Sequence, residues 1–161
     1  MSITQELVKD LLEYRNGILY WKKQTSTRTP IGSKAGKIDT KGYLIIGLNY
    51  KKYKAHRIIF LMFNGYLPAT IDHIDGNRLN NKIENLREVT VSQNMQNSKT
   101  YKSSKSGIKG VSWEKDRNKW KVQVMLDGKN RVVRNLESLE LAQLVAQELR
   151  NKYHGEFANN G

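Results

Sequence analysis

The 161-residue sequence has no cysteine, two prolines and three histidines. The absence of cysteine excludes structural disulfides and thiolate zinc sites, and three histidines do not favour a zinc cluster. Long hydrophobic runs are also absent: Tyr43–Leu48 and Ile58–Phe63 are far shorter than the roughly 18 to 20 residues that a membrane helix needs. The N-terminal residues show no basic segment followed by an apolar one, so no secretory signal is expected. We therefore expect a cytoplasmic protein without a membrane partner.

Acidic residues are few, because 15 aspartates and glutamates oppose 28 lysines and arginines, which gives a formal net charge of +13. Lysines and arginines that neutralise phosphates release counterions and gain affinity, so a polyanion is the favoured partner. We favour nucleic acid over an anionic membrane surface because no strongly basic amphipathic helix is evident. With 38% hydrophobic and 27% charged residues, the chain has the composition of one globular domain or two small ones.

The first 65 residues show alternating helix and strand signals. Helical spacing of leucines, a Thr4 cap and an Asn16-Gly17 stop predict a short first helix, and an apolar run that stops at Asn64-Gly65 predicts a second one. For His56, at the start of this second helix, a local hydrogen bond or cap contact is favoured over a catalytic role. The elements expected here are a helix over Thr4–Tyr14, a strand over Ile18–Lys23, a loop over Gln24–Gly36, a hairpin formed by Tyr43–Leu48 and Lys52–Tyr53, and a helix over Lys54–Phe63.

The stretch Ile71–Asn94 reads IDHIDGNRLNNKIENLREVTVSQN and is too polar to build a core. Its pattern predicts a strand over Thr70–His73, a loop held by two apolar anchors, a second strand over Asn85–Val89 and then a helix. Thr90 followed three residues later by Gln93 fits a capping box, which places Asn94 in the first turn of that helix. The order strand, loop, strand, helix therefore surrounds a candidate site.

Four side chains of this stretch suit phosphodiester hydrolysis. The carboxylate of Asp72 and the amide oxygen of Asn94 are hard ligands, suited to Mg²⁺ or Mn²⁺ with phosphate oxygens and water completing the coordination. His73 can take a proton from water near neutral pH. Neighbouring side chains of a strand point to opposite faces, so Asp72 and His73 serve one site only if the strand ends or bends there.

Asparagines are common in turns and caps, so a structural role is favoured for any single asparagine of this stretch, namely Asn77, Asn80, Asn81, Asn85 or Asn94. A lone Asp-His pair is also a weak signal. The joint spacing is more informative, because Asn85 and Asn94 follow His73 by 12 and 21 positions.

The segments AHRIIFLMFNGYLP and IDHIDGNRLNNKIENLREVTVSQNMQN together resemble the HNH endonucleases of the ββα-metal superfamily, in particular phage-type members that include homing endonucleases. The resemblance runs from about Ala55 to Asn97. It implies that Asp72 and Asn94 bind the metal ion, that His73 is the general base and that Asn85 orients His73. Many members have a histidine as the last motif residue, so Asn94 favours Mg²⁺ or Mn²⁺. The family also implies products with 5′-phosphate and 3′-hydroxyl ends.

After Asn97 the composition becomes basic and rich in serine, which predicts a linker over Ser98–Ser106. Strands are expected at Lys109–Trp113 and around Trp120–Leu126, followed by an Asp127-Gly128 turn and a strand at Arg131–Arg134. A helix capped by Ser138 should cover this sheet to about Tyr153. The expected fold is three antiparallel strands backed by one helix.

From Ser98 to Arg134 there are eleven basic and three acidic residues. The segment SGIKGVSWEKDRNKWKVQV, with KYHGEFAN near the end of the chain, resembles the AP2 DNA-binding domain, which implies DNA contacts from the sheet. A basic sheet face can enter the major groove of DNA. For Trp120 a place in the core is favoured over a DNA contact. The candidate DNA-binding residues are Lys109, Trp113, Arg117, Lys119, Lys121, Arg131 and Arg134.

The sequence thus predicts an α+β chain with an HNH nuclease domain at residues 1–97, whose ββα-metal core spans about 70–97, a basic linker at 98–106 and an AP2-like domain at 107–161. The predicted function is a Mg²⁺- or Mn²⁺-dependent endonuclease that nicks double-stranded DNA as a monomer, homing-endonuclease-like, without a small-molecule cofactor. It would act in the host-cell cytoplasm if phage-encoded. The alternative is a non-catalytic DNA-binding regulator. RNA is disfavoured because its deep, narrow major groove does not admit such a sheet.

Overall fold

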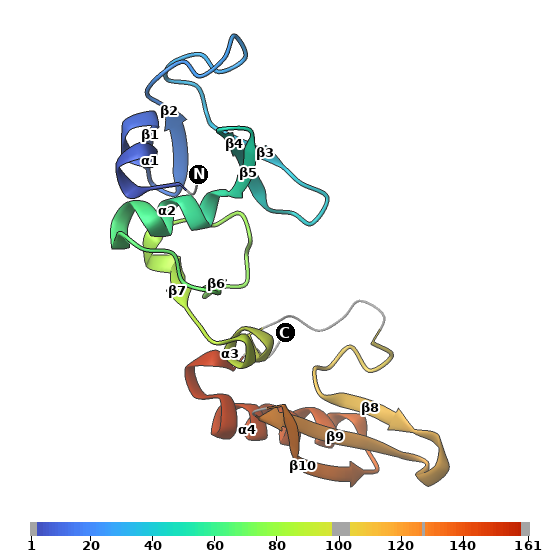
Figure 1. Ribbon diagram of the computed structural model, residues 1–161. Helices are drawn as coiled ribbons and strands as arrows, with labels where there is room; N and C mark the ends of the chain where they lie inside the picture. Colours follow the sequence, from blue (N-terminus) through green and yellow to red (C-terminus); the bar gives the residue numbers. More distant parts are fainter. Residues whose placement is uncertain (1–2, 98–103, 127, 159–161) are drawn as a thin grey trace. The chain divides into compact units, whose positions relative to one another are not determined.

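A computed structural model describes residues 3–97, 104–126 and 128–158 of the chain (Figure 1). The chain forms two compact units, Met1–Glu88 and Val89–Gly161, so the second unit begins earlier than the domain boundary predicted near Asn97. Small antiparallel sheets and helices make both units mixed α+β. In the described part of the chain, no helix combines the length and apolarity needed to cross a membrane.

The first helix is shorter than the sequence predicts. α1 spans Gln5–Leu11, and Thr4 caps it by accepting a hydrogen bond from the backbone of Leu7. Residues after it form strand β1 (Leu12–Arg15), which pairs with β2 (Ile18–Trp21). Asn16 and Gly17, with φ of 47° and 86°, form the two-residue hairpin turn, whose positive φ angles match the twist of paired strands. The Asn-Gly pair is therefore a hairpin turn rather than a helix stop.

A second sheet of the first unit has the order β3-β4-β5, with strands Lys37–Ile38, Leu44–Leu48 and Lys51–Lys54. The hairpin of β4 and β5 was predicted, whereas β3 was not. Helix α2 (Ala55–Asn64) follows directly and ends at Gly65 in the left-handed conformation, as predicted. Seven of its residues are buried, and α2 packs on α1, β4 and β5 to form the centre of the core (Figure 1).

The predicted strand, loop and strand of the central stretch are present. β6 (Ile71–His73) pairs antiparallel with β7 (Leu86–Glu88), and a short 3-10 helix, η1 (Ile83–Asn85), leads into β7. The next helix, α3 (Val91–Gln96), begins at Thr90 with the predicted capping box. α3 belongs to the second unit.

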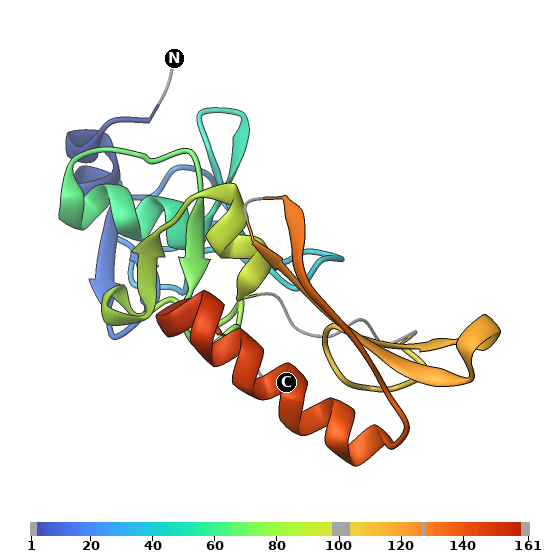
Figure 2. The ribbon, with the colours of Figure 1, turned by 90° about the horizontal axis from the view of Figure 1, so that it is seen from below.

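The second unit contains three antiparallel strands in the order β10-β9-β8 and one long helix, as predicted. The strands are β8 (Val111–Glu114), β9 (Lys119–Leu126) and β10 (Lys129–Leu136). Helix α4 (Leu139–His154), capped by Ser138, lies along the sheet (Figure 2). Val122, Val124, Ala142 and Ala146 form the core between them.

Two predicted features fall partly outside the described residues. These are the Ser98–Ser106 linker, of which residues 98–103 are not described, and the Asp127-Gly128 turn, of which Asp127 is not described. The side chain of Arg131 is likewise outside the description.

Candidate functional site

β6 and β7 position the Asp-His pair of the candidate site. In their register His73 lies opposite Leu86 and Asp72 lies opposite Arg87. Asp72 and His73 are both buried, with 8% and 5% of their surfaces exposed. β6 ends at His73, whose carbonyl accepts a hydrogen bond from the backbone of Gly76 at 2.9 Å. β6 includes both residues and ends at His73, so a site shared by Asp72 and His73 stays a prediction.

The ring of His73 lies among three polar side chains. Its Nε2 donates a hydrogen bond to Oδ1 of Asn81 at 3.0 Å. The ring of His56 lies edge-on to it, with centroids 4.9 Å apart, and the ring of Tyr43 lies 6.4 Å away. An imidazole that donates from Nε2 has Nδ1 as its basic nitrogen, so this hydrogen bond selects the nitrogen that can take a proton.

Asn85, which the sequence assigned to orienting His73, is bonded to the loop instead. Its Oδ1 accepts from the backbone of Asp75 at 3.1 Å, and its Nδ2 donates to Oδ1 of Asp75 at 2.9 Å and to the carbonyl of Asn80 at 2.8 Å. These three bonds fold residues 75–80 back against η1, and Asn81 follows next in the chain. Asn85 thereby shapes the loop, while Asn81 contacts the ring of His73.

Sequence reasoning did not single out Asn81, although it is only 3% exposed. The segment contains Asn77, Asn80, Asn81 and Asn85 within nine residues, and side-chain type alone does not distinguish them. Of the two apolar residues predicted to anchor the loop, Ile83 packs against the core, whereas Leu79 is 49% exposed, and neither indicates which asparagine contacts His73.

His56 is buried in the first turn of α2, with 4% of its surface exposed, and among the described residues its Nδ1 has no hydrogen-bond partner. Burial, with smaller contributions from the neighbouring His73, Lys54 and Arg57, lowers the pKa of His56 to about 3. His56 is therefore neutral and packs against His73 through its ring. Nδ1 of His56 therefore makes neither the predicted local hydrogen bond nor a cap contact among the described residues.

Asp72 is paired with Arg87, whose Nη2 lies 3.2 Å and whose Nε lies 3.3 Å from Oδ2 of the carboxylate. Both side chains are mostly buried, at 10% and 17% exposure. The guanidinium of Arg87 therefore places a positive charge beside the carboxylate of Asp72. A carboxylate is also a hard ligand, so its chemistry fits a divalent cation with oxygen ligands.

Asn94, the second predicted metal ligand, is half-buried in α3 of the second unit, where its backbone N–H bonds to the carbonyl of Thr90. The structure therefore places Asp72, His73 and Asn85 in the first unit and Asn94 in the second, and the hydrogen bonds described above for Asp72, His73 and Asn85 go to different partners. Within the described ranges, no group of three or more His, Cys, Asp or Glu residues is arranged to hold a metal ion. The ligand set predicted from the sequence stays a prediction.

The N-terminal hairpin supports the loop of the site. The hydroxyl of Tyr14, on β1, accepts a hydrogen bond from the backbone of Ile83 at 3.1 Å. A Cβ added to Gly17, at the hairpin turn, would lie only 3.0 Å from the backbone nitrogen of Lys82 and 3.2 Å from the carbonyl carbon of Asn81. Residues of the first 20 thus hold the loop segment that carries Asn81.

In the second unit, two of the predicted DNA-binding residues lie on the open face of the sheet. Lys119 and Lys121 are paired with Glu114 and Ser112 on β8, and these four positions share the face opposite α4. Arg117 is exposed in the short turn η2 (Lys115–Arg117) that joins β8 and β9. These three cations lie at or near the turn that joins β8 and the central strand β9.

Arg134 does not share this face. It is paired with Val122, which is fully buried under α4, although the side chain of Arg134 itself is exposed. The alternation expected along β10 is shifted by a bulge between Asn130 and Val132, because an extra residue in a strand reverses the faces that follow.

Trp113 and Lys109 also depart from the predicted open face. Trp113 is paired with Trp120, and their rings meet edge-on with centroids 4.9 Å apart. Trp120 packs against the core, as predicted, and Trp113 remains 39% exposed. Lys109 Nζ donates to the carbonyl of Gln96 at 2.5 Å, and burial, with Arg150 nearby, lowers the pKa of Lys109 to about 8.

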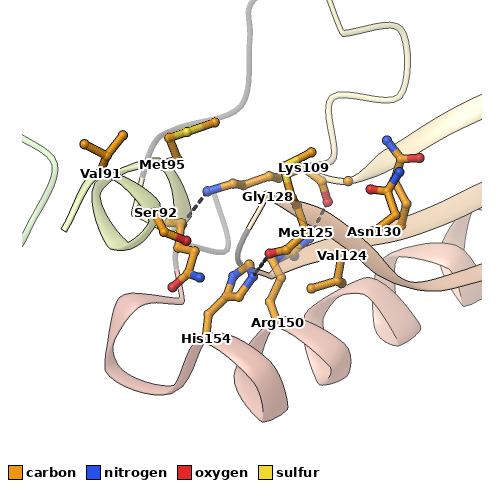
Figure 3. Close-up of a pocket in the computed structure, with 13 residues that line it drawn as sticks. Val91, Ser92, Met95, Lys109, Val124, Met125, Gly128, Asn130, Arg150 and His154 are labelled. Carbon is orange, nitrogen blue, oxygen red and sulfur yellow. Dashed lines mark hydrogen bonds between the residues drawn. The ribbon is translucent and has the colours of Figure 1, made fainter.

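Lys109 lines a pocket of about 380 Å³ in the second unit (Figure 3). The walls come from α3, from β9 and from the end of α4, where His154 bonds to the carbonyl of Met125 at 2.9 Å. Arg150, also in the wall, donates to the carbonyl of Lys109. The wall of the pocket therefore contains a half-buried lysine and a buried arginine, each of which donates to a backbone carbonyl.

Comparisons with known proteins identify a family and two viral relatives. The profile of the HNH endonuclease family matches residues 53–96, a range that contains all four predicted nuclease residues. Protein 3.8 of Escherichia phage T7 is 40% identical over 111 residues, which cover 68% of this chain and 91% of that protein. An uncharacterized HNH endonuclease of Acanthamoeba polyphaga mimivirus is 36% identical over 110 residues, which cover 66% of this chain and 56% of that protein. No solved structure gives a significant match.

The family match and the geometry concern the same residues. β6, β7 and the loop between them lie inside the matched range, and they hold His73 against Asn81 and Asp72 against Arg87. Residues 53–96 therefore form a domain of the HNH endonuclease family, in a chain that is homologous to protein 3.8 of phage T7.

Proposed function

We propose that this protein is a divalent-metal-dependent DNA endonuclease that nicks one strand of double-stranded DNA. The observation that carries the proposal is the setting of His73: a buried imidazole, held through Nε2 by Asn81, at the end of a strand that also supplies a carboxylate. The family match provides independent support, because it covers the same strand.

In the proposed reaction Nδ1 of His73 takes a proton from a water molecule, whose oxygen attacks the phosphorus atom of a phosphodiester bond. The bond between phosphorus and the 3′ oxygen breaks, and the leaving 3′ oxygen takes a proton from solvent water. Asn81 fixes the tautomer and the ring direction, and the neutral ring of His56 limits how far the His73 ring can tilt. The resemblance implies that Asp72 and Asn94 would hold Mg²⁺ or Mn²⁺, which would supply positive charge to stabilise the phosphate and the leaving oxygen. The resemblance implies 5′-phosphate and 3′-hydroxyl products.

One such site per chain cuts one strand at a time, so we propose that a monomer nicks its substrate. The three-stranded sheet of the second unit would hold the DNA through Arg117, Lys119 and Lys121, as the AP2 resemblance implies. These three cations are favoured over the other predicted residues because they lie on or beside the open face.

The second candidate function is a DNA-binding regulator in which the HNH region is only a scaffold. One observation favours it: His73 has only 5% of its surface exposed, and a general base needs contact with water. Both candidates predict DNA binding, so only a cleavage assay separates them.

The test uses supercoiled plasmid incubated with the protein and Mg²⁺ or Mn²⁺, with EDTA and His73→Ala as controls. We expect the wild type to convert supercoiled plasmid to the open circular form, and we expect neither control to do so. Equal activity of wild type and His73→Ala, or no activity with either metal while both proteins still bind DNA, would reject the endonuclease in favour of the regulator.

A further inference from the structure

Next to the candidate site, the ring of Tyr43 carries two cations. Nζ of Lys54 lies 3.8 Å from the ring centroid, and the guanidinium carbon of Arg78 lies 4.9 Å from it. Tyr43 precedes β4, Lys54 ends β5 and Arg78 lies in the loop after β6. Three separate segments therefore converge on one aromatic ring, which we call the Tyr43 cluster.

The backbone holds the members of the Tyr43 cluster in place. The carboxylate of Asp39 accepts hydrogen bonds from the backbone of Lys41 at 2.9 Å and of Tyr43 at 2.8 Å, which closes the turn before β4. Arg78 Nη1 donates to the carbonyl of Lys41 at 2.7 Å, which holds the guanidinium beside the turn. Lys54 is the residue before α2, and its side chain does not cap the helix.

The Tyr43 cluster has an excess of positive charge. In the described part of the chain, neither Lys54 nor Arg78 lies within ion-pair distance of a carboxylate. Burial lowers the pKa of Lys54; the nearby Asp39 raises it, whereas Lys41, Arg57 and Arg78 lower it. Several cations thus meet one carboxylate that already accepts two backbone hydrogen bonds. Holding like charges together costs free energy, which a bound anion recovers.

The Tyr43 cluster also faces the candidate base. The ring of Tyr43 lies 5.5 Å from that of His56 and 6.4 Å from that of His73. One strand of DNA carries a phosphate for about every 3.4 Å of helix axis. A strand whose scissile phosphate lies at His73 therefore places neighbouring phosphates within reach of the cations on Tyr43.

We propose that Lys54 and Arg78, mounted on the ring of Tyr43, form a phosphate-binding site for the DNA strand that His73 cleaves. The ligand is a backbone phosphate next to the scissile one. This inference rests on the proposed endonuclease function, and it adds a binding site within the first unit to the one on the sheet of the second. The aromatic ring restricts both flexible side chains, so less conformational entropy is lost when the phosphate binds.

The experiment measures binding of a DNA duplex to the full chain in a His73→Ala background, as a function of salt. Each phosphate contact contributes about one unit to the slope of log K against log salt. We expect Lys54→Ala with Arg78→Ala to reduce this slope by about two and to weaken binding. The exchange Lys54→Arg with Arg78→Lys keeps both charges and should restore the slope.

Lys9→Ala with Lys51→Ala is the matched control, because it also removes two positive charges from the first unit. Lys9 is exposed on α1, and Lys51 points to the face of β5 opposite to that of Lys54. We expect this pair to leave the slope unchanged. An equal loss in the control, or an unchanged slope in the Lys54 and Arg78 variant, overturns the phosphate-binding site.

Cleavage assays in the otherwise wild-type protein separate this inference from the proposed function. Loss of both cations should raise KM for plasmid nicking and change kcat little, because the site binds DNA without touching the reacting atoms. If the wild type nicks and the variant keeps its KM, the site is rejected and the endonuclease stands. If the wild type does not nick, the endonuclease is rejected, and a slope that still falls by about two supports phosphate binding by this pair.

Discussion

Oδ1 of Asn81 accepts a hydrogen bond from Nε2 of His73 at 3.0 Å, and both side chains are at least 95% buried. The bond joins the end of β6 to a loop residue eight positions later. It fixes the ring direction and the tautomer of the candidate base, which are the two properties that proton transfer requires. The amide of Asn81 is in turn held by the loop that Asn85 closes.

We expect Asn81→Ala to lower kcat for nicking by about 10- to 100-fold with little change in KM, because partners that orient a functional histidine typically contribute that much. Asn81→Asp, which keeps an acceptor oxygen, should retain more activity. Asn80→Ala serves as the control, since the Asn80 side chain bonds to Asp75 and its backbone carbonyl remains available to Asn85. Equal losses for Asn80→Ala and Asn81→Ala would mean that the loop, and not the bond to His73, matters.

The support from the N-terminal hairpin can be tested with Tyr14→Phe. This change removes the acceptor of the Ile83 N–H and should lower the free energy of unfolding of the first unit by about 1 to 3 kcal/mol. Nicking should decrease as well, because Ile83 follows Asn81 closely. Tyr20→Phe, on the partner strand β2, is the control. It removes a hydroxyl from a ring that lies beneath Arg15, and it should change the free energy of unfolding by less than about 0.5 kcal/mol. Thermal unfolding and nicking rates of the two variants provide the comparison.

The pair of Asp72 and Arg87 allows a test of the metal site that does not depend on activity. We expect Arg87→Ala to destabilise the first unit by on the order of 3 kcal/mol, because it removes the guanidinium from a mostly buried carboxylate. Saturating Mn²⁺ or Mg²⁺ should recover part of the loss, since an ion that binds only the folded state stabilises it.

Arg15→Ala is the control for this measurement, because Arg15 and Glu13 form an exposed pair 2.7 Å apart. Exposed ion pairs contribute little to stability, so the free energy of unfolding of Arg15→Ala should be close to that of the wild type and should not respond to metal. A stability of Arg87→Ala that does not respond to either ion would argue against Asp72 as a metal ligand.

His56 should make the first unit sensitive to acid. Its folded pKa of about 3 lies below the ordinary histidine value of 6.5, so between these pH values the unfolded state binds more protons. Stability should therefore fall as the pH decreases below about 6.5, by about 2 kcal/mol at pH 5 relative to pH 8. His56→Gln should remove this part of the pH dependence.

Unfolding of the first unit at each pH can be followed by the fluorescence of Trp21, the tryptophan of that unit, when Trp113 and Trp120 are replaced by phenylalanine. His154→Gln is the control, because the pKa of His154 is also lowered by burial but His154 belongs to the second unit. It should leave the Trp21 transition unchanged. An unchanged pH slope in His56→Gln would show that His56 is not held neutral in the folded state.

Local signals in the sequence predicted much of the fold. Thr90 and Gln93 form the expected capping box, Gly65 ends α2, and Ser138 caps α4, because each of these motifs acts within four residues of chain. The alternation of Trp120–Leu126 correctly predicted the central strand of the second sheet. The prediction was wrong at Leu12–Tyr14, where helical spacing was overridden by pairing with β2.

The sequence by itself determined the family, the charge and the strand that carries Asp72 and His73, because these depend on residue type and short spacing. Only the tertiary structure decided that Asn81 bonds to His73, and that Tyr43, 30 residues before it, gathers Lys54 and Arg78 beside it. The four asparagines of this loop have identical side chains, so residue type cannot distinguish them. The hydrogen bonds that fold the loop determine which amide contacts the imidazole of His73. Contacts between distant segments follow from packing on α2, which no local pattern encodes.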